Sequence, residues 1–163
     1  MLKIYDIIFE EKNIELAHWD QTKWLVFSSF FFMFPSIYAY FNQLYFYSIL
    51  LLFTSLISAN YWRKATYSWR RNMDLFFAKI SFVVFAYTGI IYVNYTPYLI
   101  LGYSDLIMVA YFYYLSDKLY NLKNNNWYKY HFIFHFFLMK GQHIILKGLS
   151  RNIMLRSQNN IIL

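Results

Sequence analysis

The chain lacks cysteine entirely, and it has only 4 glycines and 2 prolines among its 163 residues. Without cysteine it forms no disulfide, offers no thiol nucleophile, and ligates neither zinc through thiolates nor an iron–sulfur cluster. Charged residues are also scarce, at 14% of the chain against about 25% in ordinary soluble domains. These absences exclude thiol chemistry and argue against a soluble globular domain.

The chain is rich in large apolar side chains instead. Aromatic residues make up 25% of the chain, with 18 Phe, 18 Tyr and 5 Trp. They gather in long runs that carry almost no charge. Because runs of about 20 apolar residues match the hydrocarbon thickness of a bilayer, the sequence predicts an all-α, polytopic integral membrane protein. We expect residues 1–163 to form a single membrane domain.

Four apolar segments are long enough to span a bilayer, and a fifth is less purely apolar. The four segments are residues 24–41, 44–62, 74–94 and 97–115, and the fifth is 130–146. Polar Asn42 and Gln43 predict a tight hairpin between the first two spans. Asp74 and Pro97 suit the first turns of the third and fourth helices, and Pro35 predicts a kink in the first.

The segments outside these runs differ in charge. Residues 4–18 alternate apolar and acidic side chains, which predicts an amphipathic surface helix within residues 1–23. This segment is too acidic for a mitochondrial transit peptide and lacks the plan of a signal peptide, so no cleavable targeting signal is expected. Residues 116–129 are polar and predict a loop, and residues 147–163 predict a loose basic tail.

The net charge of +7 bears on orientation. With four spans, the basic stretches at the N-terminus, at 63–73 and at 116–129 all lie on one side, as the positive-inside rule requires. A fifth span over 130–146 would place the basic tail on the other side. That segment therefore either crosses the membrane, lies at its interface or packs against a partner.

The basic residues of the 63–73 segment are predicted lipid-binding residues, because cations beside membrane spans contact anionic headgroups. They are Arg63, Lys64, Arg70 and Arg71, and cardiolipin is the expected lipid if the membrane is mitochondrial. The chain shows no basic stripe interleaved with exposed aromatics, so nucleic acid is not an expected partner.

Asp105 lies well inside the fourth predicted span, where buried acids are unfavourable and often functional. We expect a structural ion pair, with a cation of another subunit as one possible partner. Tyr103, Ser104 and Tyr111 are alternative hydrogen-bonding partners. Proton handling and contact with a lipid headgroup are the other interpretations.

His131 and His135 are four residues apart and therefore share one face of a helix. Two imidazoles at this spacing can bind one metal ion if a third ligand joins them. The only acids after residue 20 are Asp74, Asp105 and Asp117, and Asp74 is the candidate. The favoured interpretation is that both are interfacial histidines beside the 116–129 loop. No metal or other cofactor is therefore expected.

A three-part pattern contains these residues: Ser58-Ala-Asn-Tyr-Trp62, then Asp74, then His131-Phe-Ile-Phe-His135. Its order resembles the Ser-x-x-x-His, Asp and His-x-x-x-His elements of alkaline ceramidases and the wider CREST membrane hydrolases. The resemblance covers residues 44–146 and implies a membrane lipid hydrolase using His131, His135 and Asp74. Trp62 replaces a zinc-ligating histidine of that family, and the spans are too few, so a degenerate relative is implied.

A second resemblance concerns the respiratory chain. The composition is typical of AT-rich codons and is similar to that of small membrane proteins encoded in protist mitochondrial genomes, with an AT-rich nuclear or viral genome as the alternative. Residues 87–93 resemble the Tyr-x-Gly-Ala-Ile-x-Val stretch of the sixth mitochondrial subunit of complex I. The alternative is that Gly89 simply lets a neighbouring helix approach.

These resemblances imply a non-catalytic structural membrane subunit of a mitochondrial respiratory-chain complex, with complex I or IV favoured. The expected location is the mitochondrial inner membrane. The expected partners are other membrane subunits of the complex and phospholipids. The alternatives are the degenerate ceramidase-like hydrolase and a proton- or ion-translocating subunit in which Asp105 faces a water-filled path.

Overall fold

The computed structural model describes residues 12–159, and within them the chain is helical apart from two short strands. The all-α fold class predicted from the sequence is therefore confirmed. In chain order the elements are β1 (Lys12–Glu15), α2 (Trp19–Ser29), the 3₁₀ helix η1 (Phe30–Phe32), α3 (Met33–Phe41), α4 (Tyr45–Arg63), β2 (Thr66–Tyr67), α5 (Trp69–Tyr92), α6 (Thr96–Asn121) and α7 (Trp127–Asn159).

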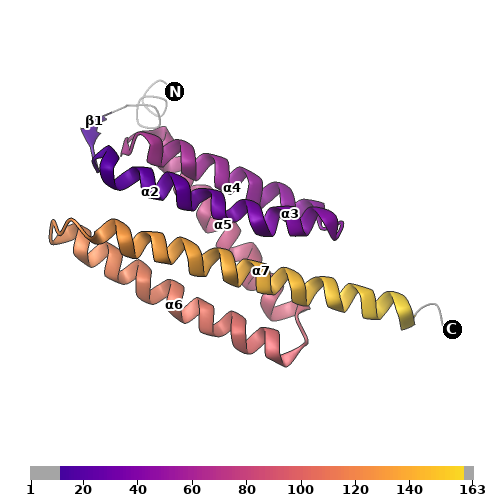
Figure 1. Ribbon diagram of the computed structural model, residues 1–163. Coiled ribbons are helices and arrows are strands. Elements are labelled where there is room, and N and C mark those ends of the chain that lie inside the picture. Colours follow the sequence, from indigo (N-terminus) through magenta and orange to yellow (C-terminus); the bar gives the residue numbers. More distant parts are fainter. Residues whose placement is uncertain (1–11, 160–163) are drawn as a thin grey trace, which may run out of the picture.

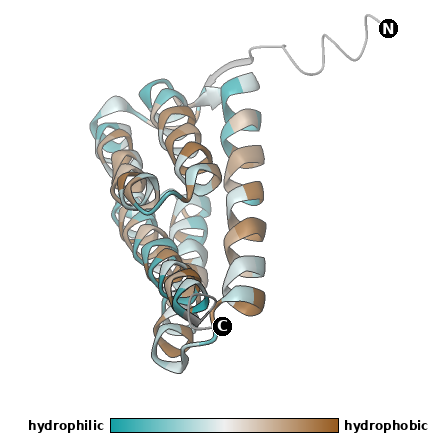
Figure 2. Ribbon diagram, turned by 90° about the vertical axis from the view of Figure 1, so that its right-hand side faces the viewer, coloured by the Kyte–Doolittle hydropathy of each residue, from teal (hydrophilic) through white to brown (hydrophobic). Residues whose placement is uncertain are grey.

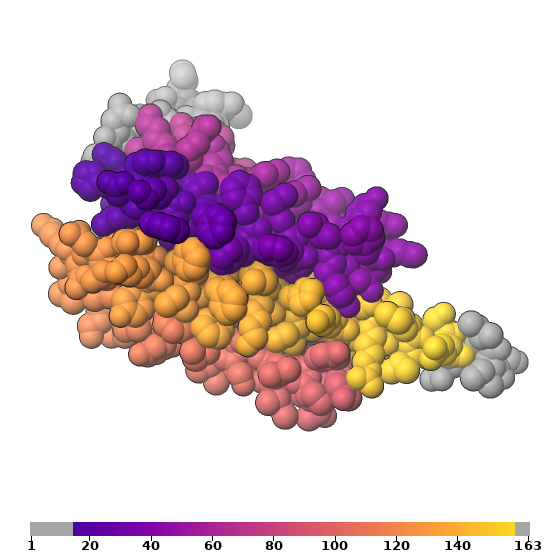
Figure 3. All heavy atoms as spheres, in the orientation of Figure 1, coloured from indigo at the N-terminus to yellow at the C-terminus, as the bar shows by residue number. Residues whose placement is uncertain are grey.

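The helices form two antiparallel hairpins that α5 connects. In Figure 1, α2–α3 lies beside α4, and α6 lies beside α7 below them. α5 runs behind both hairpins, and Figure 2 shows it upright while the other helices are seen nearly end-on. Figure 3 shows α7 between the α2–α3 layer and α6. α7 also packs against α5, so it is the central helix of the bundle.

The first predicted span is a helical stretch that tightens at its middle. Pro35 has no backbone N–H, so the carbonyl of Phe31 lacks its usual donor four residues on. The chain responds one turn earlier, where Phe30–Phe32 is a 3₁₀ helix between α2 and α3. Such a tightened turn is a recognised way of accommodating an interrupted helical ladder.

The tight hairpin predicted at residues 42 and 43 is confirmed. Gln43 adopts a positive φ of 61°, and the Leu44 N–H donates to the Ala39 carbonyl at 2.9 Å. The Asn42 side chain donates to the Tyr38 carbonyl at 2.8 Å. The left-handed residue and these two bonds end α3 and turn the chain directly into α4.

Helices α5, α6 and α7 extend beyond their predicted limits. α5 begins at Trp69, so Asp74 lies inside the helix and not in its first turn. α6 continues to Asn121 and α7 begins at Trp127, so the loop predicted over 116–129 shrinks to 122–126. The tail predicted to be loose from residue 147 is helical to Asn159. The predictions failed because they ended helices at polar residues, several of which are buried against neighbouring helices.

The amphipathic helix predicted over 4–18 is wrong where the structure describes that segment. Lys12–Glu15 is a strand that pairs antiparallel with Thr66–Tyr67, and the Leu16 N–H donates to the Ala65 carbonyl at 2.8 Å. Strand pairing satisfies these backbone groups, and the helix begins only at Trp19. Residues 1–11 of the prediction lie outside the described residues.

By length and composition, three of the described helical stretches can cross a membrane: Trp19–Phe41, Trp69–Tyr92 and Thr96–Asn121. The four to five predicted spans are thus matched only roughly, because α4 and α7 are not among the three. α4 carries a row of buried serines and a threonine, which lowers its hydropathy. α7 carries histidines, a lysine and a glutamine within its central turns.

The main apolar core lies where α3, α4, α5 and α7 meet. Its buried members are Ala39, Leu50, Leu51, Phe85 and Leu146. Leu51 and Leu146 are fully inaccessible to solvent. Close packing at this junction holds both hairpins against α5.

We predict that Leu51→Ala lowers the free energy of unfolding by about 2–4 kcal/mol, because it leaves a cavity in this core. The matched control is Leu52→Ala on the same helix, whose side chain is 38% exposed. The control should change the free energy by less than about 1 kcal/mol. Reversible unfolding in detergent micelles, followed by circular dichroism, measures both. Equal losses would contradict this placement of the core.

A polar cavity as the candidate functional site

A cavity of about 240 Å³ lies between α4, α5, α6 and α7. Its walls include serine, carboxylate, amide and imidazole side chains from helices far apart in the sequence. The polar residues most important for its chemistry are Ser58, Asp74, Ser116, His131, His135 and Gln142. A polar chamber inside a bundle of apolar helices is the default place to look for function.

His131 and His135 form a pair on one wall of the cavity, with ring centroids 4.9 Å apart. The Nδ1 atom of His135 lies 2.7 Å from the Ser28 hydroxyl. The Nδ1 atom of His131 lies 3.2 Å from the Ser116 hydroxyl. These two bonds orient the rings and leave Nε2 of each imidazole as the nitrogen available to a ligand.

Ser58 and Asp74 also line the cavity, from α4 and α5. The Ser58 hydroxyl is the side-chain hydroxyl beside the Asp74 carboxylate, and it accepts a hydrogen bond from the Ser29 hydroxyl at 3.1 Å. A carboxylate inside a helix bundle needs such donors to be tolerated. The extension of α5 back to Trp69 is what carries Asp74 into this position.

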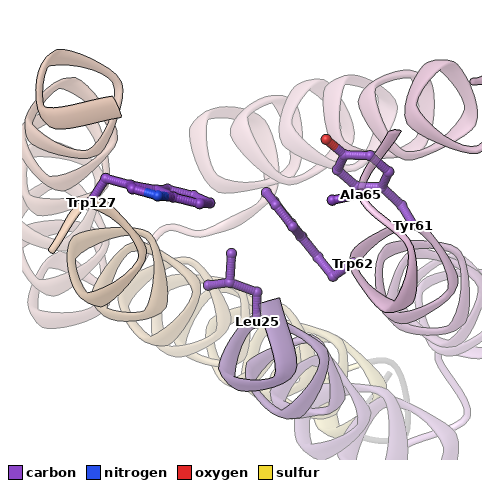
Figure 4. Close-up of a cluster of buried hydrophobic side chains, with 5 residues drawn as sticks. All are labelled: Leu25, Tyr61, Trp62, Ala65 and Trp127. Atoms are coloured by element: carbon purple, nitrogen blue, oxygen red, sulfur yellow. The ribbon is translucent and has the colours of Figure 1, made fainter. Parts of the chain in front are cut away.

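Trp62 packs against the histidine pair through its contact with His131. Its ring centroid lies 5.0 Å from that of His131, and the neighbouring Tyr61 ring lies 4.6 Å away. Figure 4 shows Trp62 between Tyr61 and Leu25, with the indole of Trp127 directed at it from α7. The indole Nε1 of Trp62 is buried and has no hydrogen-bond partner within the described residues.

The four basic residues predicted to bind lipid separate in the structure. Arg63 and Lys64 are exposed at the end of α4, and Arg70 is partly buried. Arg71 instead lines the cavity, where its guanidinium lies 5.0 Å from the centre of the Tyr67 ring. A cation stacked on an aromatic face contributes roughly 0.5–1 kcal/mol, so Arg71 is held at the cavity and not at the outer surface.

The residues of the three-part sequence pattern all line this one cavity. They are Ser58, Trp62, Asp74, His131 and His135. Even so, the part of the chain that the structure describes holds no group of three or more His, Cys, Asp or Glu side chains that could hold a metal ion. The residues therefore do not fit a zinc centre of the hydrolase type, in which Trp62 would have to be a ligand.

Asp105 lies apart from the polar cavity, and the ion pair predicted for it is present. Lys140 of α7 donates to its carboxylate at 2.9 Å, and Asp105 is only 2% exposed. Of the alternative partners, Ser104 donates instead to the Ile100 carbonyl of its own helix. The cation thus comes from the same chain, and the pair connects α6 to α7.

Gly89 and His143 also lie outside the polar cavity. His143 continues the face of the histidine pair in the sequence, but its ring packs 4.7 Å from that of Tyr38. A Cβ atom built on Gly89 would lie 3.5 Å from Ile145. Gly89 therefore faces α7, which agrees with the interpretation that it lets a neighbouring helix approach.

Sequence reasoning missed the partners of the histidines and the inner end of the cavity. These are Ser28, Ser81, Ser116 and Gln142. One signal was available on α4, where Thr54, Ser58 and Tyr61 recur every three or four residues along an apolar helix. Such spacing puts polar groups on one face and marks that face as the side turned inward.

No protein-family model, no curated protein and no solved structure matches this chain. Its function is therefore argued from the helices and the cavity.

We predict that Ser28→Ala lowers the free energy of unfolding by about 1–3 kcal/mol, because it leaves the buried Nδ1 of His135 without a partner. The matched control is Ser104→Ala, since Ser104 is exposed and bonds only within its own helix. Chemical unfolding in micelles measures both variants. If the two variants lose equal stability, the Ser28–His135 bond does not hold the ring.

Proposed function

We propose that the chain is an integral membrane subunit whose outer surface meets lipid and partner helices. Three of the described helical stretches are long and apolar enough to cross a bilayer. Large apolar side chains point outward from α5 and α6, with Ile90 63% and Ile107 68% exposed. In lipid such side chains are favourably placed, whereas in water they would form an aggregation-prone surface.

The outer face of α6 favours a protein partner in addition to lipid. Tyr103 and Tyr111 are exposed in the central turns of this helix. Neither hydroxyl makes a hydrogen bond to any part of the chain between residues 12 and 159. Unpaired hydroxyls are unfavourable in hydrocarbon, and transmembrane helices commonly satisfy such groups by bonding to one another. This face is the observation that carries the subunit proposal.

The finer form of the proposal is a non-catalytic structural subunit of a mitochondrial respiratory-chain complex in the inner membrane, with complex I or IV favoured. The AT-rich composition supports this assignment, as does the resemblance of residues 87–93 to a complex I subunit. In this role α5 and α6 pack against a core membrane subunit and its lipids, including cardiolipin. The chain itself carries no catalytic step.

We predict that native electrophoresis of mildly solubilised membranes, followed by mass spectrometry, finds the chain with respiratory core subunits in one large assembly. The double variant Tyr103→Phe/Tyr111→Phe should reduce that comigration, because it removes both mid-helix hydroxyls from the contact. Tyr114→Phe is the matched control, since the Tyr114 ring already has a polar neighbour, the Lys118 ammonium 5.9 Å from its centre. Migration of the wild-type chain alone at small size would contradict the proposal.

A second candidate function is favoured by four side chains that line one cavity: Ser58, Asp74, His131 and His135. In this interpretation the chain is a degenerate relative of the ceramidase-like membrane hydrolases. The donor set lacks a third ligand, so no hydrolytic step is assigned to the present residues. The cavity would be what remains of an ancestral site.

We predict that Trp62→His supplies the missing imidazole and lets the purified chain retain about one zinc ion, which the wild type does not retain. The added ring would lie beside His131, because the Trp62 ring already contacts it. Metal analysis after dialysis measures the difference, and Trp127→His is the control on the same aromatic cluster. Equal zinc content in both variants would overturn the ancestral-site interpretation.

A further inference from the structure

We propose that the polar cavity is a one-sided aqueous inlet, which admits water and protons from the β1–β2 end of the bundle to the His131–His135 pair. This inference does not depend on the respiratory assignment, because it concerns only how water enters the chain. The ligands proposed for the cavity are water and protons. The role of a structural subunit, proposed above, makes no use of this cavity. Five observations carry the inference.

The mouth of the cavity lies at one end of the bundle. Its lining there includes Tyr67 of β2, Asp117 near the end of α6, and Tyr120, and all three side chains are exposed. In Figure 1 this end lies beside β1 and the α6–α7 turn. Polar, exposed lining residues at the end of a membrane bundle place this opening at the aqueous boundary.

The cavity then extends inward along α7. Trp127, His131, His135 and Gln142 follow one another along its wall. At 1.5 Å of helix rise per residue, the distance from Trp127 to Gln142 is about 22 Å. The chamber therefore reaches well into a hydrocarbon layer that is about 30 Å thick.

Within the part of the chain that the structure describes, two polar atoms on the cavity wall are buried without a partner. They are Trp62 Nε1, a donor, and Gln142 Oε1, an acceptor, and the exposed fraction of Gln142 is 2%. An unpaired buried polar atom is unfavourable by about 1–3 kcal/mol. Water restores such bonds where space allows, at roughly 30 Å³ per molecule. The volume of about 240 Å³ holds several such molecules.

The inner end of the cavity lies at Gln142, which donates to the Ser81 hydroxyl at 3.0 Å. Gln142 also lines a second cavity, of about 100 Å³, whose other walls include Phe85, Leu99 and Ile145. These side chains offer no hydrogen bonds to a continuing water chain. The inlet therefore ends inside the bundle and does not connect the two sides of a membrane.

The charges around the inlet favour protons and cations over anions. Two carboxylates, Asp74 and Asp117, line it against one guanidinium, Arg71. The ionisable groups that face it are Tyr61 of α4, Tyr67 of β2, Arg71 and Asp74 of α5, Tyr113, Asp117 and Tyr120 of α6, and His131 and His135 of α7. Imidazoles and carboxylates in contact with water exchange protons with it directly.

The cysteine-free sequence makes a direct test possible. Single variants Ser58→Cys and Ser116→Cys place a thiol in the inlet, and Ser36→Cys places one in a buried position outside it. Lys64→Cys and Asn94→Cys mark the two sides of oriented vesicles. A charged, membrane-impermeant methanethiosulfonate is added to one side at a time, and modification is followed by mass spectrometry.

We predict that Ser58→Cys and Ser116→Cys react only from the side on which Lys64→Cys reacts. Their rates should exceed that of Ser36→Cys by at least about tenfold, because the reagent needs a hydrated thiolate. Rates equal to that of Ser36→Cys from both sides would show a dry cavity. Reaction from both sides would show a channel. Either result overturns the proposal.

A second measurement on the unmodified chain covers the case in which a variant does not fold. Hydrogen–deuterium exchange at the histidine C2 position requires contact with water and is read by mass spectrometry. His131 and His135 should exchange at rates approaching that of His18, which is exposed. Protection of both rings over the period in which His18 exchanges fully would also overturn the inlet.

Discussion

The structure depends on the pairing of five polar side chains of α7 with four other parts of the bundle. His135 meets Ser28 of α2, Lys140 meets Asp105 of α6, and Gln142 meets Ser81 of α5. His131 meets Ser116 of α6, and Ser150 donates to Asn42 at the α3–α4 turn. Among apolar helices an unpaired polar group is unfavourable, so these five bonds fix the rotation and height of α7. The other helices then pack around that axis.

This arrangement turns polar side chains of α7 inward and leaves many large apolar side chains on the outer faces. The inner side provides the polar cavity, while the outer faces of α5 and α6 remain available to lipid and partner helices. α7 lies beside α6 and runs antiparallel to it. Its basic end then lies at the α5–α6 turn, where the Arg151 guanidinium stacks 3.8 Å from the centre of the Tyr95 ring. Cations thus flank both ends of the bundle.

Much of the fold could be predicted from the sequence, because long apolar runs identify helices and residues 42 and 43 identify a turn. Helix limits could not, because polar residues such as Asp74 and Ser116 look like helix ends until their partners on other helices are known. The same reason explains why only some of the site residues could be predicted. His131 and His135 could be paired by spacing, and the resemblance to membrane hydrolases added Ser58 and Asp74. Ser28 and Gln142 could not be found, because their partners lie far away in the chain. The β1–β2 pairing was missed for a similar reason, since a short alternating segment fits a helix or a strand until its partner is identified.

Photolabelling of the purified chain, in bilayers whose phospholipid acyl chains carry a diazirine, tests this arrangement most directly. We predict labels on outward residues of α5 and α6, such as Phe76, Ile90 and Ile107. We predict none on His135 or Gln142, which face the interior. Labels on those two residues, or none on α5 and α6, would show that α7 is not the polar axis of a lipid-facing bundle.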